Sequence, residues 1–125
     1  MNGLVEFLTA AIAEDEAVAR AAGDHQGASW LAYGEEFVHP DPPPGNSYVA
    51  IGPWGGNIGP AAPHIARHNP ARVLAECEAK RRQIRVLTTM FAPSSRRFAP
   101  WRDRVLAIMA LPYADRPGFR EEWRA

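Results

Sequence analysis

The chain has 125 residues and a mass of 13.8 kDa, which is enough for one domain with a single modest core. Fourteen basic and fourteen acidic residues give a formal net charge of zero, but they are unevenly distributed. Residues 1–62 hold eight acidic side chains and one basic side chain, whereas residues 63–125 hold thirteen basic and six acidic ones. The zero balance therefore does not exclude a nucleic acid or an acidic protein as partner.

The single cysteine, Cys77, excludes an intramolecular disulfide framework and a cysteine-rich zinc cluster. No apolar run approaches the roughly 20 residues that a membrane-spanning helix needs. No basic segment precedes the first apolar residues, as it would in a signal peptide. We therefore expect a protein of the cytoplasm that has no membrane partner.

The first half of the sequence predicts a helix followed by a small sheet. Apolar residues recur at three- and four-residue steps over residues 3–22, which predicts an amphipathic helix that ends at Gly23. Residues 28–62 predict a β-meander with Pro/Gly loops, in which two or three short antiparallel strands alternate with turns. The segment 39–46 is excluded from the strands because its prolines lack an N–H donor.

The second half predicts two helices and a tail. Asn69 and Pro70 are a suitable cap and first residue for a long basic helix over residues 70–91. A shorter helix is expected over residues 100–111, and residues 112–125 are expected to dock through aromatic side chains. The core candidates of the shorter helix are Val105, Leu106, Ile108 and Met109, and the aromatic anchors of the tail are Tyr113, Phe119 and Trp123.

Together these elements predict an α+β fold in a single domain over residues 1–125. It comprises a long N-terminal helix, a small antiparallel sheet of two or three strands, a long basic helix, and a shorter C-terminal helix with an aromatic tail.

His64 and His68 are the candidate metal ligands, since two histidines four residues apart on a helical turn face the same way. They could share zinc or manganese if His25, His39 or an acidic residue of the first half supplied a third ligand. In the alternative interpretation, one histidine packs at a helix junction and the other is solvated. No metal site is therefore assigned, and no cofactor is expected.

No catalytic residue is assigned either. Cys77 lies on the apolar stripe of the long basic helix, which is typical of a core thiol. The sequence contains no Gly-x-Ser-x-Gly nucleophile elbow and no phosphate-binding loop.

The arginine-rich second half is the best candidate for a binding surface, and the loop around Trp54 is a second one. Arginines interleaved with aromatic residues suit contact with phosphates and bases, but they also suit an acidic protein. The candidate partner-binding residues are Arg82, Arg85, Arg96, Arg97, Trp101 and Trp54.

Asp15 suggests a structural role for part of the basic charge. It falls inside the apolar stripe of the first helix, where a carboxylate needs a partner. We expect Lys80 or Arg81 to supply a structural ion pair, either within one chain or across a homodimer.

Several strings of this sequence resemble a small actinobacterial and actinophage family, which is a domain of unknown function with the number 6221. They are HIARHNPARVLAE at residues 64–76, EAKRR at 78–82, ALPYADRP at 110–117, REEWR at 120–124 and LVEFL at 4–8. Many relatives carry a cysteine cluster between the long helix and the Leu-Pro-Tyr segment. Residues 88–104 contain no cysteine here, so a metal role of that cluster is not transferable.

The resemblance implies a phage, prophage or actinobacterial setting but no known activity. Our functional hypothesis is a small cytoplasmic accessory protein that is not an enzyme and that binds a host protein or another macromolecule. Two alternatives stay open. One is a metal-dependent enzyme that uses His64 and His68, and the other is nucleic-acid binding through the arginine-rich second half.

Overall fold

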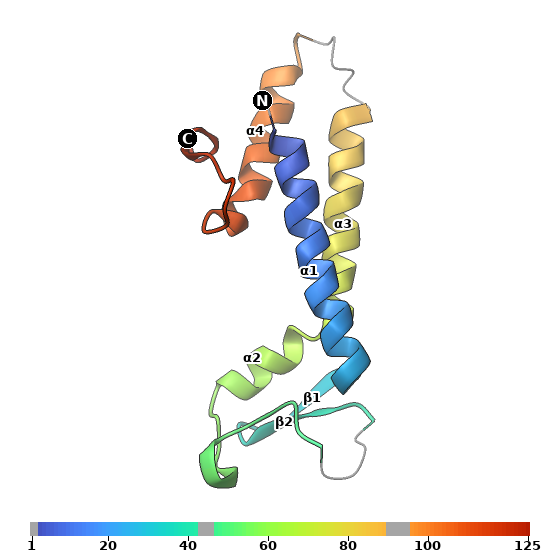
Figure 1. The fold of residues 1–125 in the computed structure, drawn as a ribbon, viewed down its shortest axis with the longest axis vertical. Helices are drawn as coiled ribbons and strands as arrows, with labels where there is room; N and C mark the ends of the chain where they lie inside the picture. Colours follow the sequence, from blue (N-terminus) through green and yellow to red (C-terminus); the bar gives the residue numbers. More distant parts are fainter. Residues whose placement is uncertain (1–2, 43–46, 90–95) are drawn as a thin grey trace. The chain divides into compact units, whose positions relative to one another are not determined.

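A computed structural model describes residues 3–42, 47–89 and 96–125 of the chain. Within these ranges the fold is α+β, as predicted, with helices α1 (Leu4–Gln26), α2 (Ala61–Arg67), α3 (Pro70–Thr89) and α4 (Ala99–Ala110) (Figure 1). One antiparallel sheet contains β1 (Trp30–Tyr33), β2 (Phe37–Pro40) and β3 (Ala50–Ile51) in that order. Short 3-10 helices are η1 (Pro53–Gly55), η2 (Leu111–Tyr113) and η3 (Glu121–Trp123).

The contacts divide the chain into two compact units. Met1–Glu14 and Cys77–Ala125 form the first, which we call the basic unit, and Asp15–Glu76 form the second, the acidic unit. The basic unit has eleven basic and seven acidic residues, whereas the acidic unit has three basic and seven acidic ones. The expected single domain over residues 1–125 stays a prediction.

The core of the basic unit comes from one stripe on each of its helices. Residues spaced by three, four or seven positions lie on one helix face, so a few large apolar side chains per helix suffice. The buried side chains include Leu4, Leu8, Ala11 and Ile12 of α1, Cys77, Ile84 and Leu87 of α3, and Leu106, Ala107 and Ala110 of α4. Cys77 is buried, and its Sγ lies 3.9 Å from the carbonyl oxygen of Ile12.

The segment after α4 packs on α1 through three aromatic rings. The ring centroids of Phe7 and Trp123 are 5.2 Å apart, those of Phe7 and Phe119 6.0 Å, and those of Phe119 and Trp123 5.6 Å. Arg116 also donates a hydrogen bond from Nη1 to the carbonyl oxygen of Ala11 at 3.0 Å. We call Phe7, Phe119 and Trp123 the tail cluster.

The acidic unit is built on the three-stranded sheet, of which one face is covered by α2. Side chains alternate across a strand, so Ala32, Val38 and Ala50 share a face. Val38 is fully buried with Ala62 and Ala66 of α2. The pairing places Ala32 opposite Val38 and Val38 opposite Ala50, which fixes the register of both strand pairs.

Two expectations about backbone breakers were wrong. The first helix continues through Gly23 and ends at Gln26, where Gly27 takes a φ of 80° and its amide N–H bonds to the Gly23 carbonyl at 2.8 Å. His39 and Pro40 belong to β2 although Pro40 has no N–H. In an antiparallel pair, hydrogen-bonded and non-hydrogen-bonded residue pairs alternate. The Asp41 amide bonds to the Ser29 carbonyl, so the next pair, Trp30 and Pro40, is a non-hydrogen-bonded one. The ladder to β1 therefore needs no N–H at Pro40.

The helix periodicity also misassigned two apolar residues. Ile108 was expected in the core, but 58% of it is exposed, because Leu106, Ala107 and Ala110 form the buried face of α4. Val18 of α1, which the periodicity over residues 3–22 places on the apolar face, is 71% exposed, whereas its neighbour Ala19 is buried. The helix expected over 100–111 is observed as α4 over 99–110, one residue earlier at both ends. The helix expected over 70–91 is observed as α3 over 70–89, and residues 90 and 91 lie outside the described residues.

Candidate functional site

The exposed large apolar side chains fall into two main groups, one in each unit. Those of the basic unit are Val86, Phe98, Trp101, Ile108 and Leu111. Those of the acidic unit are Leu31, Tyr33, Tyr48, Ile51 and Trp54, in addition to Val18 on α1. Single exposed apolar residues are ordinary, but groups of them on one surface commonly mark interaction sites. Each group is therefore a candidate binding surface.

Val86 of the basic-unit group lines a groove between α3 and α4 with a volume of about 330 Å³. Val86 and Leu87 of α3 form one wall with Gln83, and Val105 and Met109 of α4 form the other. We call this feature the α3/α4 groove.

Two exposed residues of α4, Trp101 and Ile108, extend the apolar surface beside the half-buried Val105 of the groove. Trp101, Val105 and Ile108 are spaced by four and three residues, so they share one face of the helix. Trp101 and Ile108 are both more than half exposed. The sequence assigned Trp101 to a binding surface but placed Ile108, Val105 and Met109 in the core.

Arg82 of α3 gives the groove a positive rim. Arg82 lines the groove, and its Nε donates to Oε1 of Glu78 at 2.9 Å. Arg85 reaches the same oxygen at 3.9 Å. Both guanidinium groups are largely exposed, and exposed pairs of this kind contribute only about 0–1 kcal/mol. One carboxylate facing two guanidinium groups leaves this stretch of α3 with a net positive charge.

Arg96 and Arg97 lie just before α4 rather than on the rim of the groove. Arg97 places its guanidinium carbon 5.5 Å from the centre of the Phe98 ring, a cation–π distance. Arg96 lines a wide, open hollow with Arg104 and Asp103. The structure thus groups Arg82 with the groove, and no described contact brings Arg96 or Arg97 to it.

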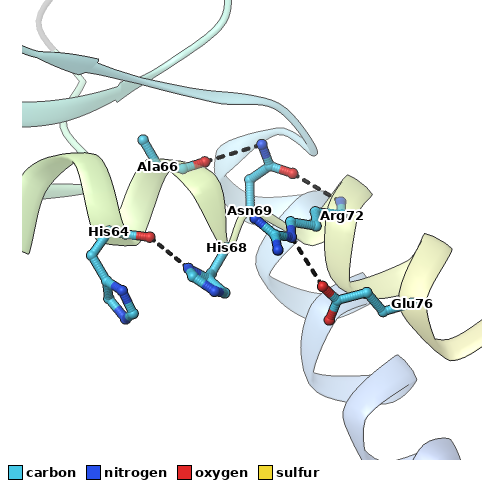
Figure 2. A network of polar contacts seen from close by, with 6 residues as sticks. All are labelled: His64, Ala66, His68, Asn69, Arg72 and Glu76. Atoms are coloured by element: carbon cyan, nitrogen blue, oxygen red, sulfur yellow. Dashed lines mark hydrogen bonds and ion pairs between the residues drawn. The ribbon is translucent and has the colours of Figure 1, made fainter.

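His64 and His68 are adjacent in the structure, with ring centroids 4.5 Å apart (Figure 2). Nδ1 of His68 donates to the carbonyl oxygen of His64 at 2.8 Å, which leaves Nε2 of His68 as the acceptor nitrogen. No group of three or more His, Cys, Asp or Glu side chains that could hold a metal gathers in residues 3–42, 47–89 and 96–125. The pair therefore supplies two ligands, and the metal hypothesis stays untested.

The junction after the histidines confirms the predicted start of the long helix. Oδ1 of Asn69 accepts a hydrogen bond from the Arg72 amide at 2.9 Å, and Pro70 is the first residue of α3. Nδ2 of Asn69 donates to the Ala66 carbonyl at 3.2 Å, so one side chain joins the end of α2 to the start of α3 (Figure 2). This capping gives the segment a structural role whether or not the histidines bind a metal.

The expected ion pair of Asp15 stays a prediction, because Asp15 belongs to the acidic unit and Lys80 and Arg81 belong to the basic unit. Within the basic unit, Nζ of Lys80 donates to the hydroxyl of Tyr113 at 2.9 Å and lies 5.1 Å from the centre of its ring.

Trp54 is fully exposed and has a φ of 60°, a backbone conformation that residues other than glycine rarely adopt. Its loop is held by hydrogen bonds from the Gly52 amide to the Gly56 carbonyl at 2.9 Å and from the Gly56 amide to the Pro53 carbonyl at 3.0 Å. A Cβ on Gly52 would lie 2.3 Å from the Gly56 oxygen, so this close approach requires glycine. An unfavourable conformation that presents a bare indole is typical of a recognition loop.

No helix of the described residues is long and apolar enough to cross a membrane. A family model described as a family of unknown function (DUF6221) matches residues 1–125, so the chain belongs to that family. No curated protein and no solved structure matches the chain.

Proposed function

We propose that this member of the DUF6221 family is an accessory protein that binds a protein partner through the α3/α4 groove. The groove itself is the observation that carries the proposal: it is an apolar channel of about 330 Å³ between two helices, beside exposed Trp101 and Ile108. Grooves between helices commonly receive an amphipathic helix that inserts apolar side chains at positions i, i+3 or i+4, and i+7.

The charge around the groove favours an acidic partner segment. Arg82 and Arg85 share a single carboxylate, so an amphipathic helix with acidic residues beside its apolar stripe would complement both the channel and its rim. Such a contact would gain affinity mainly from the buried apolar residues, whereas the rim charges would favour the correct partner and faster association.

Nucleic-acid binding is the first alternative, and it rests on Arg96, Arg97 and Trp101. An indole that is more than half exposed can stack on a base, and the arginines before α4 can contact phosphates. The apolar lining of the α3/α4 groove has no role in nucleic-acid binding. We therefore rank nucleic-acid binding below protein binding. If the chain binds single-stranded DNA with an affinity that falls with salt, and Trp101→Ala weakens this binding, nucleic-acid binding would rank above protein binding.

A metal-dependent enzyme built on His64 and His68 is the second alternative, because the two rings are adjacent. Catalytic zinc normally has three protein ligands, and the described residues gather two. Stoichiometric zinc or manganese in protein purified without a histidine tag would support this alternative.

The proposed setting is the cytoplasm of an actinobacterium, with the gene carried by the host, a prophage or a phage. The buried, single Cys77 is compatible with a reducing compartment. The partner is then a host or phage protein, and a homodimer is the simplest self-association to test.

The test compares two matched substitutions that place a glutamate at an exposed valine of a helix. Val86→Glu puts a negative charge into the groove, and Val18→Glu makes the same change on α1, outside it. The tagged proteins are incubated with an actinobacterial lysate at low and high salt, and the retained proteins are identified by mass spectrometry. We expect a specific protein that is retained by the unmodified chain and by Val18→Glu but lost with Val86→Glu. Equal retention by both variants would contradict the groove as the binding site.

A further inference from the structure

The sheet of the acidic unit exposes one face that is rich in aromatic side chains. Because side chains alternate along a strand, the residues opposite to the buried Ala32, Val38 and Ala50 point to the other face. They are Leu31 and Tyr33 of β1, Phe37 and His39 of β2, and Ile51 of β3. We call these residues, together with Tyr48, the aromatic sheet face.

Contacts between rings hold this face in a defined arrangement. The rings of Tyr33 and Phe37, which are opposite each other in the register, stack with centroids 5.2 Å apart and planes 12° apart. The ring of Tyr48 meets Phe37 edge-on at 4.9 Å and 84°. Tyr33 is 60% exposed and Tyr48 is also exposed. The rings thus stabilise one another while part of the aromatic surface stays accessible to a ligand.

The stretch of sequence that contains the aromatic sheet face is acidic. No lysine or arginine occurs between residues 21 and 66, whereas Asp24, Glu35, Glu36 and Asp41 do. Glu35 and Glu36 form the turn between β1 and β2, directly after Tyr33 and Gly34. Their carbonyl oxygens accept hydrogen bonds from the amides of Gly59 at 2.8 Å and Ile58 at 3.2 Å, so the turn has a fixed position.

We propose that the aromatic sheet face binds an arginine-bearing segment of a partner protein. A guanidinium is planar and is attracted to the face of an aromatic ring, and it pairs with carboxylates through parallel hydrogen bonds. Tyr33 supplies the exposed ring, and Glu35 and Glu36 supply carboxylates two and three residues away along the chain. This site is independent of the α3/α4 groove, which lies in the other unit and has the opposite charge.

The same charges argue against a nucleic acid on this face. Exposed rings on a sheet can stack on bases, but nucleic-acid binding depends on cations that neutralise phosphates. The segment from residue 21 to residue 66 offers none and would repel the phosphates. The acidic surroundings therefore decide in favour of a cationic ligand.

The experiment measures binding of a fluorescein-labelled peptide, (Arg-Ser)4, to the full chain by fluorescence anisotropy. The matched control peptide replaces each arginine by citrulline, which keeps the planar shape and removes the charge. We expect saturable binding of the arginine peptide and about tenfold weaker binding of the citrulline peptide. Equal affinity for the two peptides would overturn the proposal.

Variants locate the binding on the sheet. Tyr33→Ser should weaken binding of the arginine peptide by about three- to tenfold, and Tyr33→Phe, which keeps the ring, should retain it. Val18→Ser removes an exposed apolar side chain of the same unit elsewhere and should change nothing. Loss with Tyr33→Ser and Val18→Ser alike would overturn the proposal, as would loss with neither.

Further measurements distinguish this site from the α3/α4 groove, from a nucleic-acid site and from a dimer interface. Val86→Glu changes the α3/α4 groove and should bind the arginine peptide with an affinity within about twofold of that of the unmodified chain. Failure of the proposed function and failure of this inference are therefore distinguishable. Tighter binding of an eight-nucleotide single-stranded DNA than of the arginine peptide, with loss in Tyr33→Ser, would overturn the proposal in favour of a nucleic acid. Self-association that Tyr33→Ser abolishes, without peptide binding, would overturn it in favour of a second copy.

Discussion

Replacing Trp123 by alanine tests the packing of the tail cluster. Trp123 is 2% exposed, and its ring contacts those of Phe7 and Phe119. Truncation of a buried tryptophan typically costs about 3–5 kcal/mol of unfolding free energy. Each aromatic pair contributes about 0.5–1.5 kcal/mol beyond its buried area, and Trp123 takes part in two of them. These terms place the expected loss well above that of a surface substitution.

One feature of Trp123 opposes this loss. Its Nε1 is buried and has no hydrogen-bond partner in the part of the chain that the structure describes. A buried donor without a partner costs about 1–3 kcal/mol, and truncation of the indole removes this cost. We therefore expect Trp123→Ala to lose about 3 kcal/mol, at the lower end of the range. Trp123→Phe keeps most of the ring packing without the N–H, so it should lose about 1 kcal/mol or less.

The assay is urea unfolding followed by far-ultraviolet circular dichroism, because tryptophan fluorescence would change with the substitution itself. Trp101→Ala is the matched control, since Trp101 lies on α4 of the same unit and is more than half exposed. It should lose less than about 1 kcal/mol. A loss below about 1 kcal/mol for Trp123→Ala, or one equal to that of Trp101→Ala, would refute the packing that we describe.

Three further predictions use other parts of the chain. Trp54→Gly should leave the midpoint of thermal unfolding unchanged or raise it, because glycine adopts the φ of 60° without strain; a lower midpoint would contradict this. Arg124 donates a hydrogen bond to the carboxylate of Glu121 and holds the pKa of Glu121 below its ordinary value of 4.5, so Arg124→Gln should raise this pKa. The stabilisation by this pair is present above pH 4.5 and is lost as the pH falls through the lowered pKa. A carboxyl titration by nuclear magnetic resonance measures it, and an unchanged pKa would refute the pairing. If the adjacent rings of His64 and His68 bind zinc, His64→Ala should abolish stoichiometric metal in elemental analysis, whereas equal metal content in the variant would exclude the pair as ligands.

Local sequence signals predicted the three longer helices and one of their caps correctly. They missed α2 as a separate helix, because residues 61 and 62 were expected in the β-meander and only a helical turn was expected at His64 and His68. The Asn69–Pro70 start of α3 depends on a side-chain oxygen that bonds to an amide three residues later, so adjacent residues contain all the information. The same local rules misjudged Gly23 and Pro40. A glycine can remain in a helix, and a proline can remain in a strand, when the hydrogen bonds of the neighbouring residues do not require a change.

The two surfaces could be predicted only in part, because each depends on contacts between elements. Trp101 and Arg82 were identified from composition, but the α3/α4 groove also needs Val86 and Met109, and sequence periodicity does not show which helix lies beside them. On the sheet, the alternation of residues 30–33 indicates which side chains share a face. Only the register of β1 with β2 shows that Tyr33 and Phe37 are opposite each other.

The structure also accounts for part of the charge asymmetry. Along the sequence, the two halves differ in sign and each carries an excess of seven charges, whereas the two compact units carry an excess of four. The difference arises because Glu6 and Glu14 fold with the basic second half, and because residues 63–76, with a net charge of +1, fold with the acidic unit. Glu14 of α1, for example, lies 3.3 Å from Nη1 of Arg116. Folding therefore neutralises part of the asymmetry and leaves the rest as net charge in each unit.

The residual charges coincide with the two apolar surfaces. Arg82, which shares Glu78 with Arg85, lines the α3/α4 groove, and the acidic turn of Glu35 and Glu36 follows Tyr33 of the aromatic sheet face. Opposite charge beside apolar contact area would suit the two binding sites that we propose, since charge selects the partner and apolar burial supplies the affinity.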